Sequence, residues 1–72
     1  MKTTLDIVSI AKTGVNIVLD ASVKTTMDLS LIIREVAATG AHITLQNCNR
    51  KTTLDLRSLA MIAPKQITMS FV

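Results

Sequence analysis

Only a few side chains in this sequence could do chemistry, and two of the relevant residue types occur once. The 72 residues include one histidine, His42, and one cysteine, Cys48. A metal ligand or a catalytic nucleophile needs partner groups, and the chain has no second residue of either type. We therefore expect His42 to be a surface imidazole and Cys48 to be a buried, structural thiol at a turn.

Three aspartates have a regular setting. Asp6, Asp28 and Asp55 each follow a Lys-Thr-Thr-Leu or Lys-Thr-Thr-Met sequence. Three carboxylates could serve as acid–base groups, but helix capping explains their spacing. In Thr-x-x-Asp the threonine hydroxyl accepts a hydrogen bond from a free amide of the first turn, and the aspartate can reach back toward the cap. With no Gly-rich phosphate loop or metal motif, we expect no catalytic residue, no cofactor, no metal site and no enzyme activity.

The aspartates belong to a block that occurs three times. The six residues from Lys2 recur from Lys24 and again from Lys51, at spacings of 22 and 27 residues. Such near-identity in a short chain indicates tandem structural repeats. Each block predicts the start of a helix, with Thr3, Thr25 and Thr52 as the N-caps. We expect one domain, residues 1–72, made of the repeats 2–23, 24–50 and 51–72.

Each expected helix leads into a short segment of alternating polarity. The helices should cover residues 4–13, 26–38 and 53–63, with Gly14, Gly40 and Pro64 marking their ends. The alternating segments, 15–20, 41–46 and 65–70, are typical of strands with one apolar face. The expected class is α/β: three helix–strand repeats that form a three-stranded parallel sheet with all helices on one face.

The repeats place equivalent side chains in columns. Ile17, Ile43 and Ile67 share one column of the sheet, and Leu19, Leu45 and Met69 share another. A stripe on each helix should pack against these columns. Its residues are Ile7, Ile10 and Ala11, then Leu29, Ile32 and Ile33, then Leu56, Leu59 and Ala60.

The second strand segment resembles part of a leucine-rich repeat. Ile43-x-Leu45-x-x-Cys48 matches the strand and the asparagine-or-cysteine turn of that family, and Ile17-x-Leu19-x-x-Ser22 is a weaker copy. In the third repeat Val72 falls in the position of Cys48. The resemblance implies a leucine-rich-repeat-like solenoid segment whose exposed sheet face or edge binds another protein.

Two surfaces are therefore candidates for interaction. The polar sheet face should present Asn16, Val18, Asp20, His42, Thr44, Gln46, Gln66, Thr68 and Ser70 to a partner protein. Residues 66–72, the end of the last strand segment, carry no charge, proline or glycine, which describes an unprotected sheet edge. We expect antiparallel pairing of third strands to form a homodimer, with the edge residues Ile67, Met69, Phe71 and Val72 at or near the seam.

A second hypothesis concerns the end of the sheet where the strands finish and the helices begin. Lys2, Lys24, Arg50 and Lys51 gather there beside three helix N-termini, whose amides favour anions. They could form a strip that binds phosphate, nucleic acid or an acidic partner. Duplication of a solvated lysine explains the same pattern without any ligand.

Charge and hydropathy exclude further classes of protein. The net charge of +3 is too small to indicate nucleic-acid binding, so that partner is not expected. No apolar run is long enough to span a bilayer, and the first residues lack the apolar core of a secretory signal. Together with the single cysteine, this predicts a cytoplasmic protein without a membrane partner. The brevity of the sequence is the reason to expect a bacterial style.

Overall fold

Each Lys-Thr-Thr block starts a helix at its first threonine. In the computed structural model, which describes residues 2–72, the three helices are α1 (Thr4–Ala11), α2 (Thr26–Thr39) and α3 (Thr53–Ala60). The hydroxyls of Thr3, Thr25 and Thr52 accept hydrogen bonds from the amides of the aspartates three residues later, at 3.1–3.2 Å. The predicted N-caps are confirmed. The aspartate carboxylates make no return bond to the caps within residues 2–72, because an aspartate is one methylene shorter than the glutamate of a full capping box.

Two of the helices end earlier than predicted. α1 ends at Ala11 and continues as a turn to Gly14, whose φ of +90° suits glycine. α2 ends one residue later than predicted, with Gly40 as a left-handed C-cap. α3 ends at Ala60, before the predicted limit of residue 63. Proline disfavours the helical conformation in the residue before it, and Ala63 is non-helical at φ −156° and ψ 72°.

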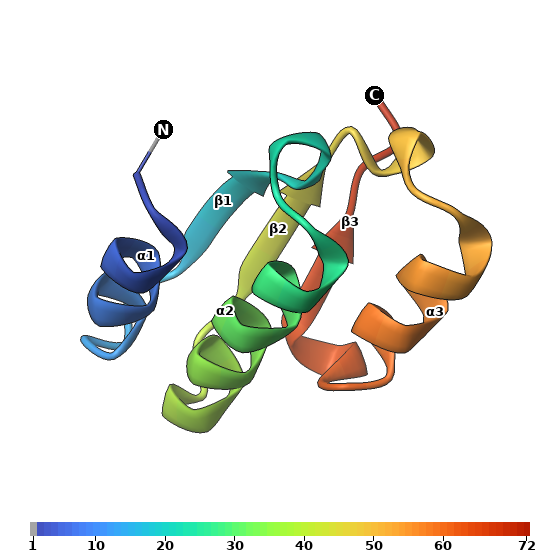
Figure 1. Cartoon of the computed structure of the whole chain (residues 1–72). Coiled ribbons are helices and arrows are strands. Elements are labelled where there is room, and N and C mark those ends of the chain that lie inside the picture. Colours follow the sequence, from blue (N-terminus) through green and yellow to red (C-terminus); the bar gives the residue numbers. More distant parts are fainter. Residues whose placement is uncertain (1) are drawn as a thin grey trace.

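The strands form one parallel sheet in sequential order. They are β1 (Ile17–Asp20), β2 (Ile43–Gln46) and β3 (Ile67–Met69), arranged β1-β2-β3 (Figure 1). Each strand is shorter than its predicted segment. The pairing register nevertheless places the two apolar columns as predicted, with Ile17 beside Ile43 and Ile43 beside Ile67. This confirms the α/β class and the parallel sheet.

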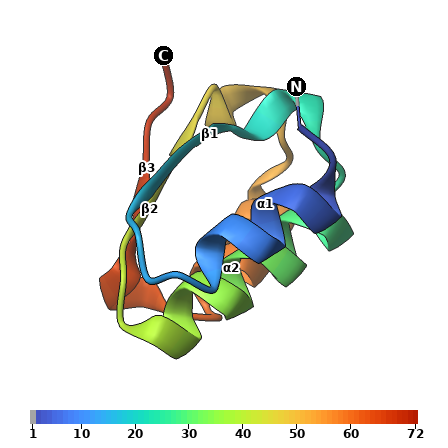
Figure 2. The same ribbon diagram turned by 90° about the vertical axis from the view of Figure 1, so that its left-hand side faces the viewer.

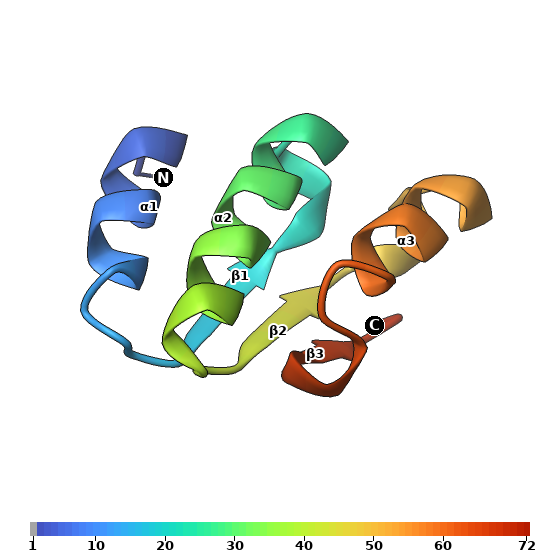
Figure 3. The same cartoon turned by 90° about the horizontal axis from the view of Figure 1, so that it is seen from below.

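All three helices cover the same face of the sheet. Figure 2 shows the strands on one side and the helices on the other, and Figure 3 shows α2 between α1 and α3. The core between the two layers is aliphatic and contains no buried polar residue among those described. Leu29, Ile32 and Ile33 of α2 are fully buried, as expected for the central helix. Ile10 of α1 was expected in the core and is 44% exposed, because no helix covers that side of α1.

The unequal repeat spacings come from two local insertions. α2 is longer than α1 by six residues, and the distance from N-cap to strand grows by about one helical turn. The second repeat also has one extra residue after its strand, Asn47, which adopts a left-handed conformation at φ 57°. The 3₁₀ turns η1 (Ala21–Val23) and η2 (Cys48–Arg50) then restore the common geometry before the next lysine, while η3 (Pro64–Gln66) precedes β3.

Candidate functional site

The uncovered face of the sheet displays side chains from alternate positions of the three strands. Val18, Gln46 and Thr68 are exposed and Thr44 is partly exposed, whereas the intervening residues point into the core. Val18 is the large apolar side chain on this face, with 64% of its surface accessible. The outward direction predicted for these residues is correct.

Four residues of the predicted sheet face form hydrogen bonds that join neighbouring repeats. Asn16 Oδ1 accepts a hydrogen bond of 2.9 Å from the amide of His42, and His42 Nε2 lies 2.7 Å from Thr68 Oγ1. Gln66 precedes β3 in η3 and is partly buried. Its Nε2 donates to the carbonyl of Ala41 at 2.9 Å and to that of Ala37 at 3.3 Å. Gln66 therefore stabilises the loop after α2.

The last residue of β1 binds the turn that follows it. Asp20 Oδ1 accepts from Ser22 Oγ at 2.6 Å and from the Ser22 amide at 2.9 Å. These bonds from Ser22 lower the pKa of the Asp20 carboxyl, with smaller contributions from the side chain of Asn47 and the charge of Arg50. Asp20 is thus a carboxylate that caps η1. Ser70, the last predicted member of the sheet face, is partly buried beside β2.

Cys48 is buried at the start of η2, as predicted. Its Sγ donates to the carbonyl of Leu45 at 3.3 Å, and burial raises the pKa of the thiol. In the first repeat the equivalent buried residue is Ala21, at the start of η1; Ser22, which the sequence pattern aligned with Cys48, is exposed. Asn47 shifts the alignment by one residue. Val72, aligned with Cys48 in the third repeat, is 92% exposed.

The recurring lysines connect one repeat to the next. Lys24 Nζ donates to the carbonyl of Lys2 at 3.0 Å, and Lys51 Nζ donates to the carbonyl of Lys24 at 2.8 Å. We call this pair of bonds the lysine ladder. Because an ammonium group makes stronger hydrogen bonds than a neutral donor, the ladder gives the recurrence of lysine a structural reason.

The lysine ladder reduces the number of free ammonium groups that the predicted anion strip could use to bind an anion. Lys24 and Lys51 are partly buried, and each ammonium group already has a backbone acceptor. Lys2 and Arg50 are exposed. The four basic residues do lie near the same end of the sheet, but the two central ones are held by the protein itself.

The outer edge of β3 remains uncovered in the described chain. Beyond Met69 the pairing with the second repeat continues: Ser70 N donates to the Leu45 carbonyl at 2.8 Å, and Cys48 N donates to the Ser70 carbonyl at 2.9 Å. Because Ser70 directs both backbone groups inward, the backbone groups of Met69 and Phe71 point to the opposite, open side. Ile67 and Met69 are partly buried, whereas Phe71 and Val72 are exposed.

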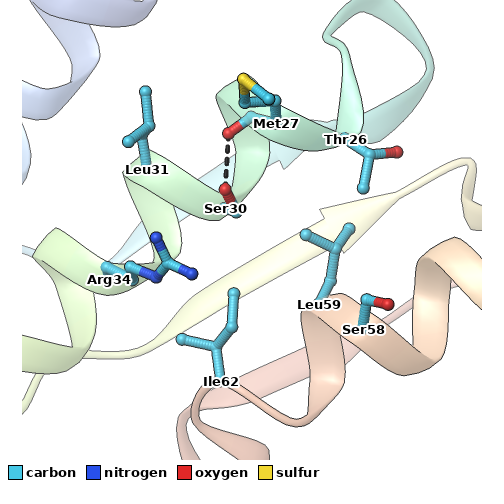
Figure 4. Close-up of a pocket in the computed structure, with 8 residues that line it drawn as sticks. All are labelled: Thr26, Met27, Ser30, Leu31, Arg34, Ser58, Leu59 and Ile62. Atoms are coloured by element: carbon cyan, nitrogen blue, oxygen red, sulfur yellow. Dashed lines mark hydrogen bonds between the residues drawn. The ribbon is translucent and has the colours of Figure 1, made fainter.

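A shallow groove lies between α2 and α3. Leu31 and Met27 line it from α2 and Leu59 and Ile62 from the α3 side, and the guanidinium group of Arg34 points from α2 toward the space between the helices (Figure 4). The groove exists because α2 packs more extensively against α1 than against α3. Sequence reasoning did not identify it. The signal was the small residue on each wall, Ser30 and Ser58, at positions where larger side chains would close the gap.

The acidic residues do not gather into a metal site. Within residues 2–72, no group of three or more histidine, cysteine, aspartate or glutamate side chains is placed to hold a metal ion. Asp6, Asp28 and Asp55 each remain at the start of a separate helix. None of the helices described is both long and apolar enough to cross a membrane.

The fold and these surfaces define an α/β protein built from three helix–strand units. Comparison with known proteins adds no relative: no family model, no curated protein and no solved structure matches the chain.

Proposed function

We propose that the chain is a non-enzymatic protein–protein interaction module of the short repeat type, and that it associates with itself through the β3 edge. The observation that carries the proposal is the open backbone of Met69 and Phe71 beside exposed apolar side chains. An uncovered strand without charges is a template for another strand. The smallest assembly of this kind is a homodimer in which two three-stranded sheets become one.

The outer sheet face is the second proposed surface, for a different protein. Parallel sheets are normally covered on both faces, so a bare face with an exposed Val18 favours docking. Thr44, beside Val18 on the next strand, and Gln46 add neutral hydrogen-bonding groups. Asp20, His42 and Thr68 already have partners in the chain and would mainly shape the rim of this surface.

The proposed architecture is leucine-rich-repeat-like. Support comes from Cys48, whose buried thiol bonds the Leu45 carbonyl at the turn after the strand, where that family places an asparagine or cysteine. The free thiol in the core also favours the cytoplasm as the location, because reducing conditions keep such thiols unpaired.

The anion strip is the weaker alternative. Of the four basic residues, Lys2 and Arg50 are exposed, whereas the ammonium groups of Lys24 and Lys51 already bind carbonyl oxygens. Affinity that falls steeply with salt concentration would favour this alternative, since phosphate binding releases counterions. Protein binding through the sheet should respond less to salt.

Light scattering tests the self-association. At about 100 μM, well above a typical constant for weak association, the wild-type mass should exceed that of one chain. Met69→Lys places a charge on the β3 edge and should restore the mass of one chain. Lys65→Met, a change at an exposed residue outside the edge, is the control. A wild-type protein that stays monomeric at this concentration contradicts the proposal.

The sheet face needs a separate test. Binding of any identified partner protein should be lost in Thr44→Arg/Thr68→Arg, which adds two charged side chains to the bare face. The matched control, Ser9→Arg/Ser58→Arg, adds the same charges on the helix side. Equal binding by both double variants would exclude the sheet face as the docking surface.

A further inference from the structure

Equivalent positions in the three repeats are not equally covered. Ile32 is 0% exposed and Leu59 is 1% exposed, whereas Ile10, their counterpart on α1, is 44% exposed. Leu59 lines the groove between α2 and α3, so this position faces the preceding helix (Figure 4). Ile10 therefore faces the side of α1 where a preceding helix would pack.

The opposite edge shows the complementary pattern. Leu56 is only partly buried, whereas its counterparts on α1 and α2, Ile7 and Leu29, lie in the core. Met69 is likewise partly buried, unlike Leu45 on β2. These two positions are covered by a following repeat wherever one exists. Within residues 2–72, therefore, no helix covers the outer side of the first repeat, and no strand or helix covers the outer side of the third.

The lysine ladder also runs in one direction along the repeats. In each bond the lysine of one repeat donates to the carbonyl of the lysine before it. Within residues 2–72, Lys2 Nζ has no such acceptor and the Lys51 carbonyl has no such donor. The donor is at one edge of the molecule and the acceptor is at the other.

We infer that the partner of the β3 edge is the β1 edge of a second copy, docked head to tail with its strand parallel to β3. This rests on the proposed self-association and specifies its arrangement. The contact would repeat the interface that the chain already forms twice, between its own repeats. It would cover Leu56 and Met69 of one copy with α1 and β1 of the next, and it would cover Ile10 in return. Lys2 of the second copy would donate to the Lys51 carbonyl of the first.

Antiparallel pairing of two β3 strands would cover fewer of these open apolar positions and would give Lys2 no acceptor. A two-fold axis at β3 covers Met69 on both copies but leaves Ile10 exposed and Lys2 without its acceptor. It also leaves both β1 edges open. A head-to-tail contact joins two different edges, so association can continue beyond two copies unless geometry closes a ring.

Two matched variants distinguish the arrangements. Ile10→Lys blocks the β1 edge and Met69→Lys blocks the β3 edge, and in both the long lysine stem can keep the charge in solvent. Each variant alone should have the mass of one chain at about 100 μM. An equimolar mixture should form a dimer, because each variant retains the edge that the other needs. Circular dichroism should be used to check that both variants are folded.

Each alternative outcome has a definite meaning. If Ile10→Lys alone still dimerises, or if the mixture stays monomeric while the wild type associates, head-to-tail docking is wrong and self-association stands. A monomeric wild type overturns the proposed self-association itself.

Lys2→Met provides a test with little risk to folding, since Lys2 is exposed and its Nζ has no acceptor within residues 2–72. Loss of one charge-assisted hydrogen bond should weaken association about tenfold. Lys12→Met, an exposed lysine outside the ladder, is the charge-matched control. Equal affinity of the two variants would overturn the head-to-tail arrangement.

Discussion

Thr3, Thr25 and Thr52 fix the positions at which the helices begin. Each adopts an extended backbone and accepts one amide bond, while the threonine after it is the first residue of the helix. The two adjacent threonines therefore have different roles despite their identical chemistry. Only the first can satisfy a free donor of the first turn.

Replacing the cap of α3 tests this difference. Thr52→Ala removes the acceptor of the Asp55 amide and should lower the free energy of unfolding by about 1 kcal/mol. In a chain of this size that corresponds to roughly 4–8 °C in Tm, measured by circular dichroism. Thr53→Ala is the control and should cost less, because alanine is a good helix former. Equal losses in the two variants would show that capping does not stabilise α3.

Asp20 gives the protein a specific response to acid. Its carboxyl pKa is lowered below the ordinary 3.8, first by the bonds from Ser22. A lowered pKa in the folded state means that the stabilisation is present above about pH 3.8 and is lost as the pH falls through the folded value. The midpoint of urea unfolding should therefore decrease below that pH, and less so in Asp20→Asn.

The control for this acid response is Ser22→Ala, which keeps the carboxyl but removes the largest cause of its shift. An NMR titration of the Asp20 carboxyl should give a pKa nearer 3.8 in Ser22→Ala than in the wild type. An identical pKa in the two proteins would contradict the role given to Ser22.

At the scale of elements, the lysine ladder joins helix starts that are far apart in sequence. Lys51→Met removes the 2.8 Å bond to the Lys24 carbonyl, between the second and third repeats. The unfolding free energy should fall by about 1 kcal/mol, since the bond is charge-assisted but only partly buried. Urea denaturation measures the change. Lys65→Met should have almost no effect; a similar loss in both variants would show that the ladder contributes no stability.

The repeated block made the helices and strands predictable, but it did not predict where they end. Capping and alternation depend on residues close in sequence, so the helix starts, the strand columns and the parallel order follow from the pattern. The end of α3 at Ala60 depends on how Pro64 constrains Ala63, and the burial of Ala21 opposite Cys48 depends on the left-handed Asn47. A pattern aligned by hydrophobicity does not reveal one inserted residue.

The candidate surfaces were predicted in outline only. Alternation gave the direction of each strand side chain, so the exposure of Val18 and Thr68 could be expected. The bonds of Gln66 and of the ladder lysines cross between repeats, and their acceptors are backbone carbonyls. Backbone acceptors leave no trace in the residue sequence. These residues therefore looked free for binding when they were already used in folding.

At the scale of the whole molecule, the two edges carry the same kinds of apolar residue as the interior. At the edges, however, no neighbouring repeat covers these residues within the described chain. A chain of this length has only about 4–11 kcal/mol of stability, so apolar positions left open at its edges are a considerable loss. The interior of the array shows what the same positions contribute once a neighbour is present. Ile10 and Ile32 form the most direct comparison, because they are the same residue type at equivalent positions on adjacent helices.

Truncating Ile32 should mainly lower the stability of the single chain, whereas truncating Ile10 should mainly weaken association. Ile32→Ala creates a cavity at a fully buried site and should cost about 2–5 kcal/mol, enough to unfold a large fraction of the protein. Ile10→Ala removes a side chain that is 44% exposed and should cost less than half as much in dilute solution, where single chains dominate. Urea denaturation at low and high protein concentration measures both.

At high concentration Ile10→Ala should lose more of the concentration-dependent stability than the exposed control Leu5→Ala, because Ile10 lies at the head-to-tail contact and Leu5 does not. If Ile10→Ala and Ile32→Ala cost the same at low concentration, α1 does not have an uncovered side and the equivalence between its open edge and the inner repeats is wrong.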